Sequence, residues 1–271
     1  MRFLCLLGIC LIAASGNAQQ RIIGGVETTI ESYPFSASML FSPNNQYYEH
    51  QCGGTIITNN AILSAAHCFT SLPGNDSPPA LFWRARVGSA RWATGGVVHG
   101  LRDVIIHPNY DRDTQDSDIA VLRTETRIRY NAQVARASIA GKYYTVADRS
   151  EVWVIGWGKT SLTSGEYSPI LKHNNLTKIN HKECQDEIGA NVITDNVICI
   201  GRRTPTGSAG GQCNGDSGSP VIQYHQKQPV IVGVTSWAFN CTLGRYYGVM
   251  NAKVSSFSDW INETVITTNK V

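Results

Sequence analysis

Three polar residues, far apart along the chain, have side chains that together activate a hydroxyl. His67 follows the apolar segment AILSA, Asp118 directly precedes the apolar segment IAVL, and Ser217 lies in the glycine-rich run GGQCNGDSGSP. Each residue alone is more often structural: a core histidine, a turn-forming aspartate or a loop serine. Together they supply a general base, an orienting carboxylate and a nucleophile, the combination that makes a neutral hydroxyl reactive near pH 7.

The neighbouring sequence constrains each of these side chains. Cys68 stands beside His67 and would pin its backbone, and Asp118 at the start of an apolar strand predicts an inward-facing carboxylate that needs a donor. In the glycine-rich run, Gly215 and Gly218 let the backbone aim a hydroxyl outward. We therefore expect a fixed imidazole, a buried carboxylate and an accessible hydroxyl.

The elements that must position these residues have the pattern of strands. Short apolar or alternating segments, among them GGTIIT, AILSA, DVIIH, EVWVIGW and PVIVGVTSW, are separated by clusters of Gly, Pro, Asn and Asp. This pattern is typical of an all-β sandwich or of barrels. Near the C-terminus, Val254, Phe257, Ile261 and Val265 recur at helical spacing, which predicts an amphipathic helix over about 253–266. With 271 residues, the chain is long enough for one large domain or two small ones.

The first 18 residues have the pattern of a secretory signal peptide. They carry one positive charge, at Arg2, then an apolar run from Phe3 to Ala14 and the small-residue pair Gly16-x-Ala18. The apolar run is too short to cross a bilayer as a helix, and no later segment resembles a membrane span. We therefore expect a secreted, extracellular, soluble protein with no membrane partner.

Charge and cysteine content narrow the class of protein further. Without residues 1–21 the chain has 21 basic and 20 acidic side chains and no basic cluster, so its charge gives no reason to expect nucleic acid as a partner. Six of the eight cysteines remain, and in an oxidising compartment an even number predicts three disulfides among fifteen formal pairings. Zinc binding is the alternative, but the sequence contains no Cys-x-x-Cys pair.

Seven motifs in chain order resemble those of the trypsin/chymotrypsin family of serine endopeptidases. They are RIIGG, CGGTII, LSAAHC, DIAVL, GWG, GDSGSP and SW, and the resemblance runs from residue 22 to about 262. The segments TTIESYPFSA and GRYYGVMNAKVSSFSDWI are most similar to insect digestive members. The resemblance implies one protease domain over 22–266. Its two six-stranded antiparallel β-barrels, about 22–135 and 136–250, would pack around a cleft and be followed by the C-terminal helix.

The resemblance also implies a role for each residue of the candidate site. Asp118 would hold the tautomer of His67, which would take the proton of Ser217 as that hydroxyl attacks a peptide carbonyl. The backbone N–H groups of Gly215 and Ser217 would face the oxyanion, and losing one such donor costs roughly 2.7 to 4 kcal/mol. Since His67 and Asp118 fall in the first barrel and Ser217 in the second, the site is expected in the cleft between them.

Members of this family are made as zymogens and mature by an N-terminal cut. Arg21–Ile22 is a bond that a trypsin-like protease would cleave, which makes residues 19–21 a short activation propeptide after the signal peptide at 1–18. The resemblance implies that the new ammonium of Ile22 pairs with a buried Asp216 and locks the turn around the nucleophile. A buried carboxylate without its partner is destabilising by roughly 3 to 5 kcal/mol, enough to favour another loop arrangement in the uncut chain.

Disulfides, cofactors and glycans complete what the sequence implies. The family pattern pairs Cys52 with Cys68, Cys184 with Cys199 and Cys213 with Cys241. No cofactor or metal is implied, and because residues 80–101 contain no Asp or Glu, the acidic calcium loop of many relatives is not expected. Asn-x-Ser/Thr acceptor matches occur at Asn75, Asn175, Asn240 and Asn262.

Six residues are expected to form the specificity pocket: Gly211, Gln212, Ser236, Trp237, Ala238 and Gly248. In the trypsin pattern an aspartate lies six residues before the nucleophile, but this chain has Gly211 there, so a substrate Lys or Arg would lack its counter-ion. Small walls at Ala238 and Gly248 leave room for a large apolar side chain, worth roughly 1.5 to 3 kcal/mol on burial. This predicts a chymotrypsin-like preference. The side chain of Gln212 could shorten the pocket. Met250 resembles an extra residue in the strand behind the pocket, so the family's wall position corresponds either to Gly248 or to a residue one position away.

Two alternatives stay open. One is an elastase-like or broad specificity, and the other is a catalytically silent relative that acts as a binding or decoy protein. The complete triad and Gly215 favour an enzyme. The resemblance implies protein or peptide substrates, an activating trypsin-like protease and proteinaceous inhibitors as the partners of a monomer, and analogy with digestive members suggests the gut lumen.

Overall fold

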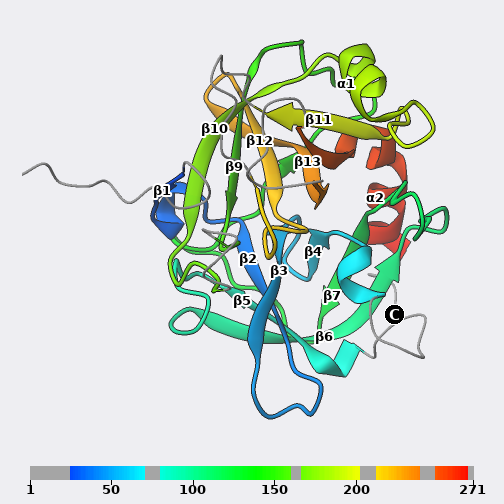
Figure 1. Cartoon of the computed structure of the whole chain (residues 1–271). Helices are drawn as coiled ribbons and strands as arrows, with labels where there is room; N and C mark the ends of the chain where they lie inside the picture. Colours follow the sequence, from blue (N-terminus) through cyan, green and yellow to red (C-terminus); the bar gives the residue numbers. More distant parts are fainter. Residues whose placement is uncertain (1–24, 71–79, 160–165, 202–211, 239–247, 268–271) are drawn as a thin grey trace, which may run out of the picture.

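The first half of the chain forms a closed ring of six antiparallel strands. The computed structural model describes residues 25–70, 80–159, 166–201, 212–238 and 248–267. In spatial order the ring consists of β2 (Ser36–Phe41), β3 (Glu49–Ile56), β4 (Ala61–Ser64), β7 (Ala120–Thr124), β6 (Val97–Ile106) and β5 (Trp83–Val87). It occupies the lower half of the molecule in Figure 1.

A second ring of six antiparallel strands follows in the sequence. In spatial order it consists of β10 (Lys172–Lys178), β11 (Val197–Gly201), β14 (Val249–Lys253), β13 (Gln228–Trp237), β12 (Pro220–His225) and β9 (Glu151–Gly156), and it closes where β9 pairs with β10. Two short strands are added to this ring: β1 (Val26–Glu27) pairs with β10, and β8 (Ser138–Ile139) runs parallel to β13. The two six-stranded antiparallel barrels predicted from the sequence are thus confirmed.

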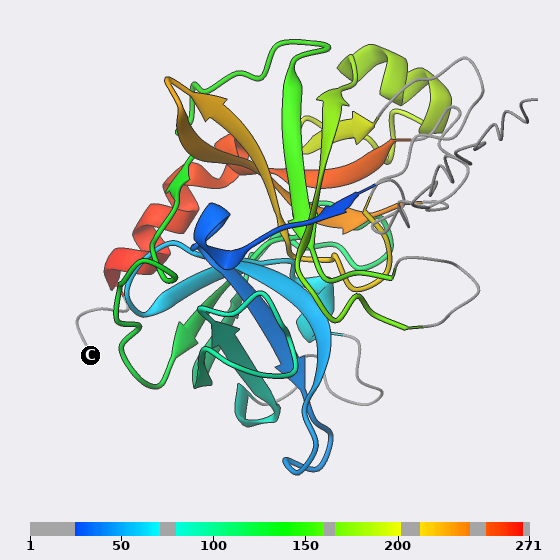
Figure 2. The same cartoon turned by 90° about the vertical axis from the view of Figure 1, so that its left-hand side faces the viewer.

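The C-terminal helix that the apolar spacing predicts is α2 (Val254–Thr267). It buries Val254, Phe257 and Ile261, as an amphipathic helix on the body should. It packs against β13 and reaches β7, so one helix contacts both barrels (Figure 2). Within the described ranges, no helix is long and apolar enough to cross a membrane.

The other helices are short. The sequence pattern does not predict α1 (His181–Ile188), which begins at Asn180, whose side chain accepts a hydrogen bond from the N–H of Glu183 at 3.1 Å. Three single turns of 3-10 helix lie in the first barrel or lead into it: η1 (Ile30–Ser32), η2 (His67–Phe69) and η3 (Ala80–Phe82). The second of these carries the candidate histidine.

Alternation along the strands sorts side chains between the core and the surface. In β5, for example, Trp83, Ala85 and Val87 are buried, whereas Arg84 and Arg86 are only partly covered. The buried apolar side chains of the two barrels form one continuous cluster. The barrels are therefore packed against each other and share a core, which fixes the geometry of any site at their junction.

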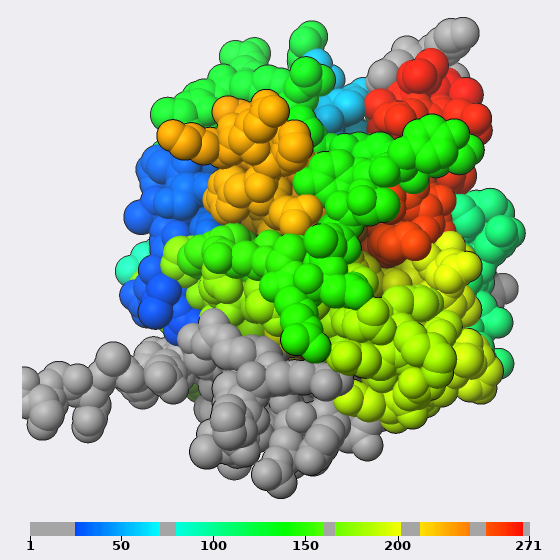
Figure 3. Space-filling model, turned by 90° about the horizontal axis from the view of Figure 1, so that it is seen from above, coloured from blue at the N-terminus to red at the C-terminus, as the bar shows by residue number. Residues whose placement is uncertain are grey.

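The connection between the barrels runs along the outside of the second one. In Figure 3 it is bright green and lies between the orange β12–β13 hairpin and the red α2. The N–H of Ala140 donates to the carbonyl of Ile231 at 2.9 Å, and the ammonium of Lys142 pairs with Asp259 of α2 at 2.8 Å. These contacts attach the connection to the barrel and to the helix.

Two of the predicted disulfides are present. Cys52–Cys68 joins β3 to η2, and Cys184–Cys199 joins α1 to β11, each with 6.5 Å between the Cα atoms. Loops of this length contribute about 3 kcal/mol each in the chain-entropy account. Cys213 is disulfide-bonded as well, and its predicted partner Cys241 lies outside the described residues.

A buried cation on β7 holds the end of α2. Arg123 is fully buried, and its guanidinium donates to the carbonyls of Thr264 at 2.9 Å and Val265 at 2.8 Å, in the last turns of the helix. It also donates to the side-chain oxygen of Asn60 at 3.1 Å. A cation at a helix C-terminus offsets the negative end of the helix dipole, so Arg123 links the first barrel to α2.

We expect Arg123→Met to lower the free energy of unfolding by about 2 to 3 kcal/mol, because hydrogen bonds from a charged donor are lost and carbonyls are left unpaired. Lys142→Met is the matched control, since Lys142 also pairs with α2 but through exposed side chains, and a much smaller loss is expected. Urea unfolding in a Ser217→Ala background, which avoids self-digestion, measures both. Equal losses in the two variants would contradict the role given to Arg123.

Candidate active site

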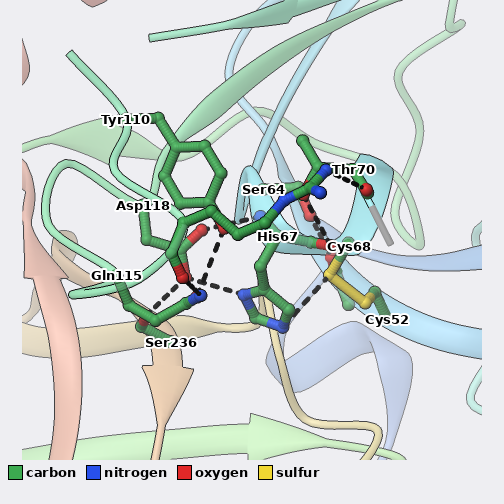
Figure 4. A network of polar contacts seen from close by, with 11 residues as sticks. Cys52, Ser64, His67, Cys68, Thr70, Tyr110, Gln115, Asp118 and Ser236 are labelled. Carbon is green, nitrogen blue, oxygen red and sulfur yellow. Dashed lines mark hydrogen bonds and ion pairs between the residues drawn. A yellow bond between two sulfur atoms is a disulfide. The ribbon is translucent and has the colours of Figure 1, made fainter. Parts of the chain in front are cut away.

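The backbone of His67 is fixed from two sides. It follows β4 directly in η2, where the disulfide of its neighbour Cys68 ties the turn to Cys52 of β3. Its own N–H donates to Oδ1 of Asp118 at 2.8 Å (Figure 4). The imidazole therefore starts from a rigid backbone position at the end of the first barrel.

Asp118 is only 1% exposed, and three donors compensate its burial. Besides the N–H of His67, the ring Nδ1 of His67 lies 2.7 Å from Oδ2, and the hydroxyl of Ser236 donates to the same oxygen. Because a carboxylate can only accept, Nδ1 of His67 carries a proton and, in the neutral ring, Nε2 is the basic atom. The pair thus selects the tautomer that can take a proton from a hydroxyl.

The charge of Asp118 also sets the basicity of the ring. Burial lowers the pKa of His67, but the negative charge of Asp118 and the hydrogen bond to it outweigh burial, so that the pKa lies above the ordinary 6.5. The same charge stabilises the imidazolium that forms when Nε2 accepts a proton.

Ser217 lies in a turn whose backbone requires glycine at two positions, 215 and 218. Gly215 has φ 92° and Gly218 has φ 81°, both in the left-handed region. A Cβ at Gly215 would lie 2.5 Å from a ring carbon of Tyr167, and one at Gly218 would lie 2.2 Å from the hydroxyl of Ser64. Both glycines are therefore required by backbone conformation and by close packing, as the glycine-rich run predicts.

Within this turn, alternate N–H groups are used differently. The N–H of Asp216 donates to the carbonyl of Cys213 at 2.8 Å, and that of Gly218 donates to Thr235 at 2.8 Å. Across the described parts of the chain, the N–H groups of Gly215 and Ser217 have no acceptor. These two N–H groups beside the serine are therefore available to donate hydrogen bonds to an oxyanion.

Asp216 points away from this surface and is fully buried. Its oxygens accept from the N–H groups of Gly158 at 2.8 Å and Cys213 at 2.9 Å. Burial raises the pKa of Asp216 to about 7, although both hydrogen bonds act in the opposite direction. A carboxylate in this position is poorly stabilised as an anion unless a cation joins it.

A fourth polar group, His50, supports the turn and is not found by sequence reasoning. The ring Nε2 of His50 lies 2.8 Å from the carbonyl of Gly215, and Nδ1 lies 2.8 Å from the hydroxyl of Ser38. Burial lowers the pKa of His50 to about 4, so the ring is neutral, donates to the carbonyl and accepts from the serine. No local pattern in the sequence reveals this role, because the partner of His50 lies 165 residues further along the chain.

Several contacts bring the serine turn to the histidine and the aspartate. The N–H of Gly53, next to Cys52, donates to the carbonyl of Ser217 at 2.7 Å, which joins the turn to β3. Ser236, which binds Asp118, lines the same pocket as Ser217. The three residues predicted from sequence therefore all lie at the junction of the barrels, His67 and Asp118 on the side of the first and Ser217 on the side of the second.

A pocket of about 50 Å³ opens beside Ser217. It is lined by Gln212, Cys213, Asn214, Ser217, Thr235, Ser236, Trp237, Ala238 and Val249. Four of the six residues expected there therefore lie in its lining. Gly248 does not: Val249 lines the pocket instead, and a Cβ at Gly248 would lie 2.6 Å from the carbonyl oxygen of Ile200 on β11. Gly211 lies outside the described residues.

One group of potential metal ligands lies together in the part of the chain that the structure describes: Cys52, His67 and Cys68. The two sulfurs are joined in a disulfide, so neither can bind a metal as a thiolate. The two cysteines of this cluster therefore serve to hold the backbone next to His67.

Comparison with known proteins agrees with the fold. The family model described as Trypsin matches residues 22–261. The chain is 44% identical over 263 residues to Trypsin CFT-1 of Choristoneura fumiferana, a match that covers 95% of this chain and 97% of that one. It is 42% identical over 257 residues to "Trypsin, alkaline B" of Manduca sexta, covering 94% and 95% of the two chains.

Two closed barrels with a serine, a histidine and an aspartate at their junction define a serine endopeptidase of the double-barrel type. With the family model matching 240 of its residues, this chain belongs to the trypsin family, as its seven motifs predict.

We expect His50→Phe to lower kcat by roughly 10- to 100-fold, because the buried carbonyl of Gly215 loses its donor, at a cost of about 1 to 3 kcal/mol, and the turn loosens. His50→Gln should retain more activity, since its amide can still donate. The measurement is kcat on a peptide ester with the fraction of active enzyme titrated separately. If His50→Phe leaves kcat unchanged, His50 does not position the turn.

Proposed function

We propose that Ser217 is the nucleophile of this endopeptidase and that His67 and Asp118 complete its catalytic triad. The observation that carries the proposal is the pair of hydrogen bonds between His67 and Asp118, beside a turn in which two N–H groups have no acceptor among the described residues. A decoy protein would not need both a fixed tautomer and a pair of N–H donors placed for an oxyanion. The complete set favours catalysis over the alternative of a silent binding protein.

The proposed reaction proceeds in two halves on protein or peptide substrates. Nε2 of His67 takes the proton of Ser217 as its oxygen bonds to the scissile carbonyl carbon, and the N–H groups of Gly215 and Ser217 bind the oxyanion. The imidazolium, stabilised by Asp118, returns the proton to the leaving amine as the C–N bond breaks. Water then attacks the acyl-enzyme, with His67 again as the base, and releases the second product.

The test of this proposal is covalent labelling combined with hydrolysis. After removal of residues 1–21, we expect the protein to digest denatured casein and to be labelled at Ser217 by a fluorophosphonate, whereas Ser217→Ala does neither. Asp118→Asn should lower kcat by about 10⁴-fold, the loss found when this carboxylate is replaced elsewhere in the family.

The pH profile gives a second reading of the same proposal. Only neutral His67 accepts a proton, so kcat/KM should fall as the pH drops through a pKa above 6.5. A correctly processed protein that neither reacts with the fluorophosphonate nor cuts any protein would instead support the decoy alternative.

We further propose that the protein is secreted as a zymogen. Residues 1–18 would be the signal peptide, 19–21 the propeptide and 22–266 the protease domain, and cleavage after Arg21 by a trypsin-like protease would activate it. The strand register supports this proposal. Glu27 of β1 pairs with Lys172 of β10, and Lys172 pairs with Gly156 of β9. A Cβ on Gly156 would lie 2.1 Å from a carboxylate oxygen of Asp216, so Gly156 is in direct contact with that carboxylate.

The start of β1 is therefore two strands from the Asp216 carboxylate. Two strand spacings are about 10 Å, and the few residues between Ile22 and β1 can span about 13 Å when extended. A new ammonium at Ile22 can thus reach Asp216 and supply the cation that this carboxylate lacks.

We expect the uncut protein to lose stability as the pH rises from about 4 to 7. The folded state binds a proton on Asp216 with a pKa near 7, against 3.8 ordinarily, so it holds that proton more tightly than the unfolded chain does. Cleavage after Arg21 should remove this loss, because the ammonium of Ile22 favours the ionised carboxylate. Urea unfolding between pH 4 and 8, in the Ser217→Ala background, measures the slope before and after cleavage.

In the uncut protein, Asp216→Asn should flatten the dependence of the free energy of unfolding on pH. In a protein that keeps Ser217, the same substitution should leave the enzyme inactive after cleavage. Asp103→Asn, at an exposed position, should leave both properties unchanged. A full gain of activity by cleaved Asp216→Asn would exclude this mode of activation.

Extracellular action in a gut lumen, on dietary protein, with proteinaceous inhibitors as further partners of a monomer, extends the proposal by analogy with digestive relatives. The described pocket lining contains no carboxylate, so we do not propose cleavage after Lys or Arg, although the similar proteins are named trypsins. The sequence-based expectation of a large apolar side chain requires a deep pocket beside Ser217.

A further inference from the structure

The space that the described residues leave beside Ser217 is too small for an aromatic ring. Its volume is about 50 Å³, whereas an apolar cavity of about 150 Å³ is what takes up benzene. The space found is that of one or two methyl groups or water molecules. Small walls at Ala238 and Gly248 would predict a deeper slot, so other side chains must fill it.

Val249 is the first of these side chains, and the register of β14 places it there. Val249 lines the pocket, whereas Met250 is buried in the separate apolar cluster around the disulfide Cys184–Cys199. Consecutive strand residues face opposite sides, so Val249 and Met250 cannot exchange places. The one-position ambiguity that Met250 creates in the sequence is thereby resolved in favour of a branched side chain in the wall.

Gln212 is the second side chain that fills the pocket. It is 1% exposed and lines the pocket, and its side-chain N–H donates to the hydroxyl oxygen of Thr235. That hydroxyl donates its own proton to the carbonyl of Ser219 at 2.9 Å, so its oxygen is free to accept from Gln212. Moving the amide out of the pocket would break this buried hydrogen bond and leave the hydroxyl oxygen of Thr235 without its donor. Gln212 is therefore a fixed part of the pocket and does not yield readily to a substrate.

We infer that Val249 and Gln212 restrict this enzyme to cleavage after small uncharged side chains, such as those of Ala, Ser and Val. The inference rests on the proposed function, since it assumes that Ser217 attacks the bond next to the residue in this pocket. It replaces the large apolar preference expected from sequence with the elastase-like alternative, and it names the two residues responsible.

The test is a comparison of cleavage preferences in processed enzyme. Peptide substrates that differ only before the scissile bond, with Ala, Ser, Val, Phe, Tyr, Lys or Arg, are expected to give a kcat/KM for Ala at least 10-fold above that for Phe. The cut sites in reduced, denatured casein, mapped by mass spectrometry, should follow small residues. Fastest cleavage after Phe or Tyr, or after Lys or Arg, would overturn the inference.

Variants separate the two residues from the general fold. Val249→Gly combined with Gln212→Ala should raise the ratio of Phe to Ala cleavage by roughly 10- to 100-fold, the value of burying an aromatic side chain. Met250→Leu changes the neighbouring residue on the opposite face and should leave the ratio unchanged. If the double variant does not fold, Val249→Ala should still move the ratio in the same direction.

Labelling with the fluorophosphonate distinguishes this inference from the proposed function. A wild-type protein that is labelled at Ser217 but cuts casein after large residues contradicts the inference alone. A processed protein that is neither labelled nor active contradicts the proposed function as well.

Discussion

The buried charge of Asp118 is the constraint on which the site depends. A carboxylate that is 1% exposed needs donors, and it takes them from the backbone and ring of His67 in the first barrel and from Ser236 in the second. The barrels must therefore pack in one relative position for this charge to be tolerated. The hydrogen bond from the ring of His67 to Asp118 also fixes the tautomer of the histidine. The hydrogen bonds of Asp118 therefore both stabilise the junction of the barrels and make Nε2 of His67 the basic atom.

The glycine-rich turn depends on this junction in a second way. Two of its N–H groups have no acceptor among the described residues, and its backbone is held by His50 and by the hydrogen bond from Gly53 to Ser217. Asp216 lies beneath the turn with a raised pKa and without a cation among the described residues. One added charge can order or release such a turn, which is the physical basis of the proposed activation by an N-terminal ammonium.

Much of this arrangement follows from the sequence, and what does not follow has physical reasons. Strand alternation gives the strands and the spacing of Val254, Phe257 and Ile261 gives α2, because periodic burial is a local property. The arrangement of the strands in two barrels follows from the resemblance to a protease family. The eight-residue α1 is polar and buries only Cys184, so it has no apolar stripe long enough to predict it. His50 is recognisable only from its partner, the carbonyl of Gly215, which is 165 residues away.

The pocket shows most clearly why sequence similarity sets the mechanism but not the preference. The register of β14 places Val249 on the pocket wall, whereas the sequence alone favours Gly248 there. Asp118, His67 and the serine turn lie outside β14, so this wall residue differs without a change in the elements that hold them. The proposed preference for small side chains is therefore compatible with 44% identity to a named trypsin, because identity over the whole chain does not fix a single pocket residue.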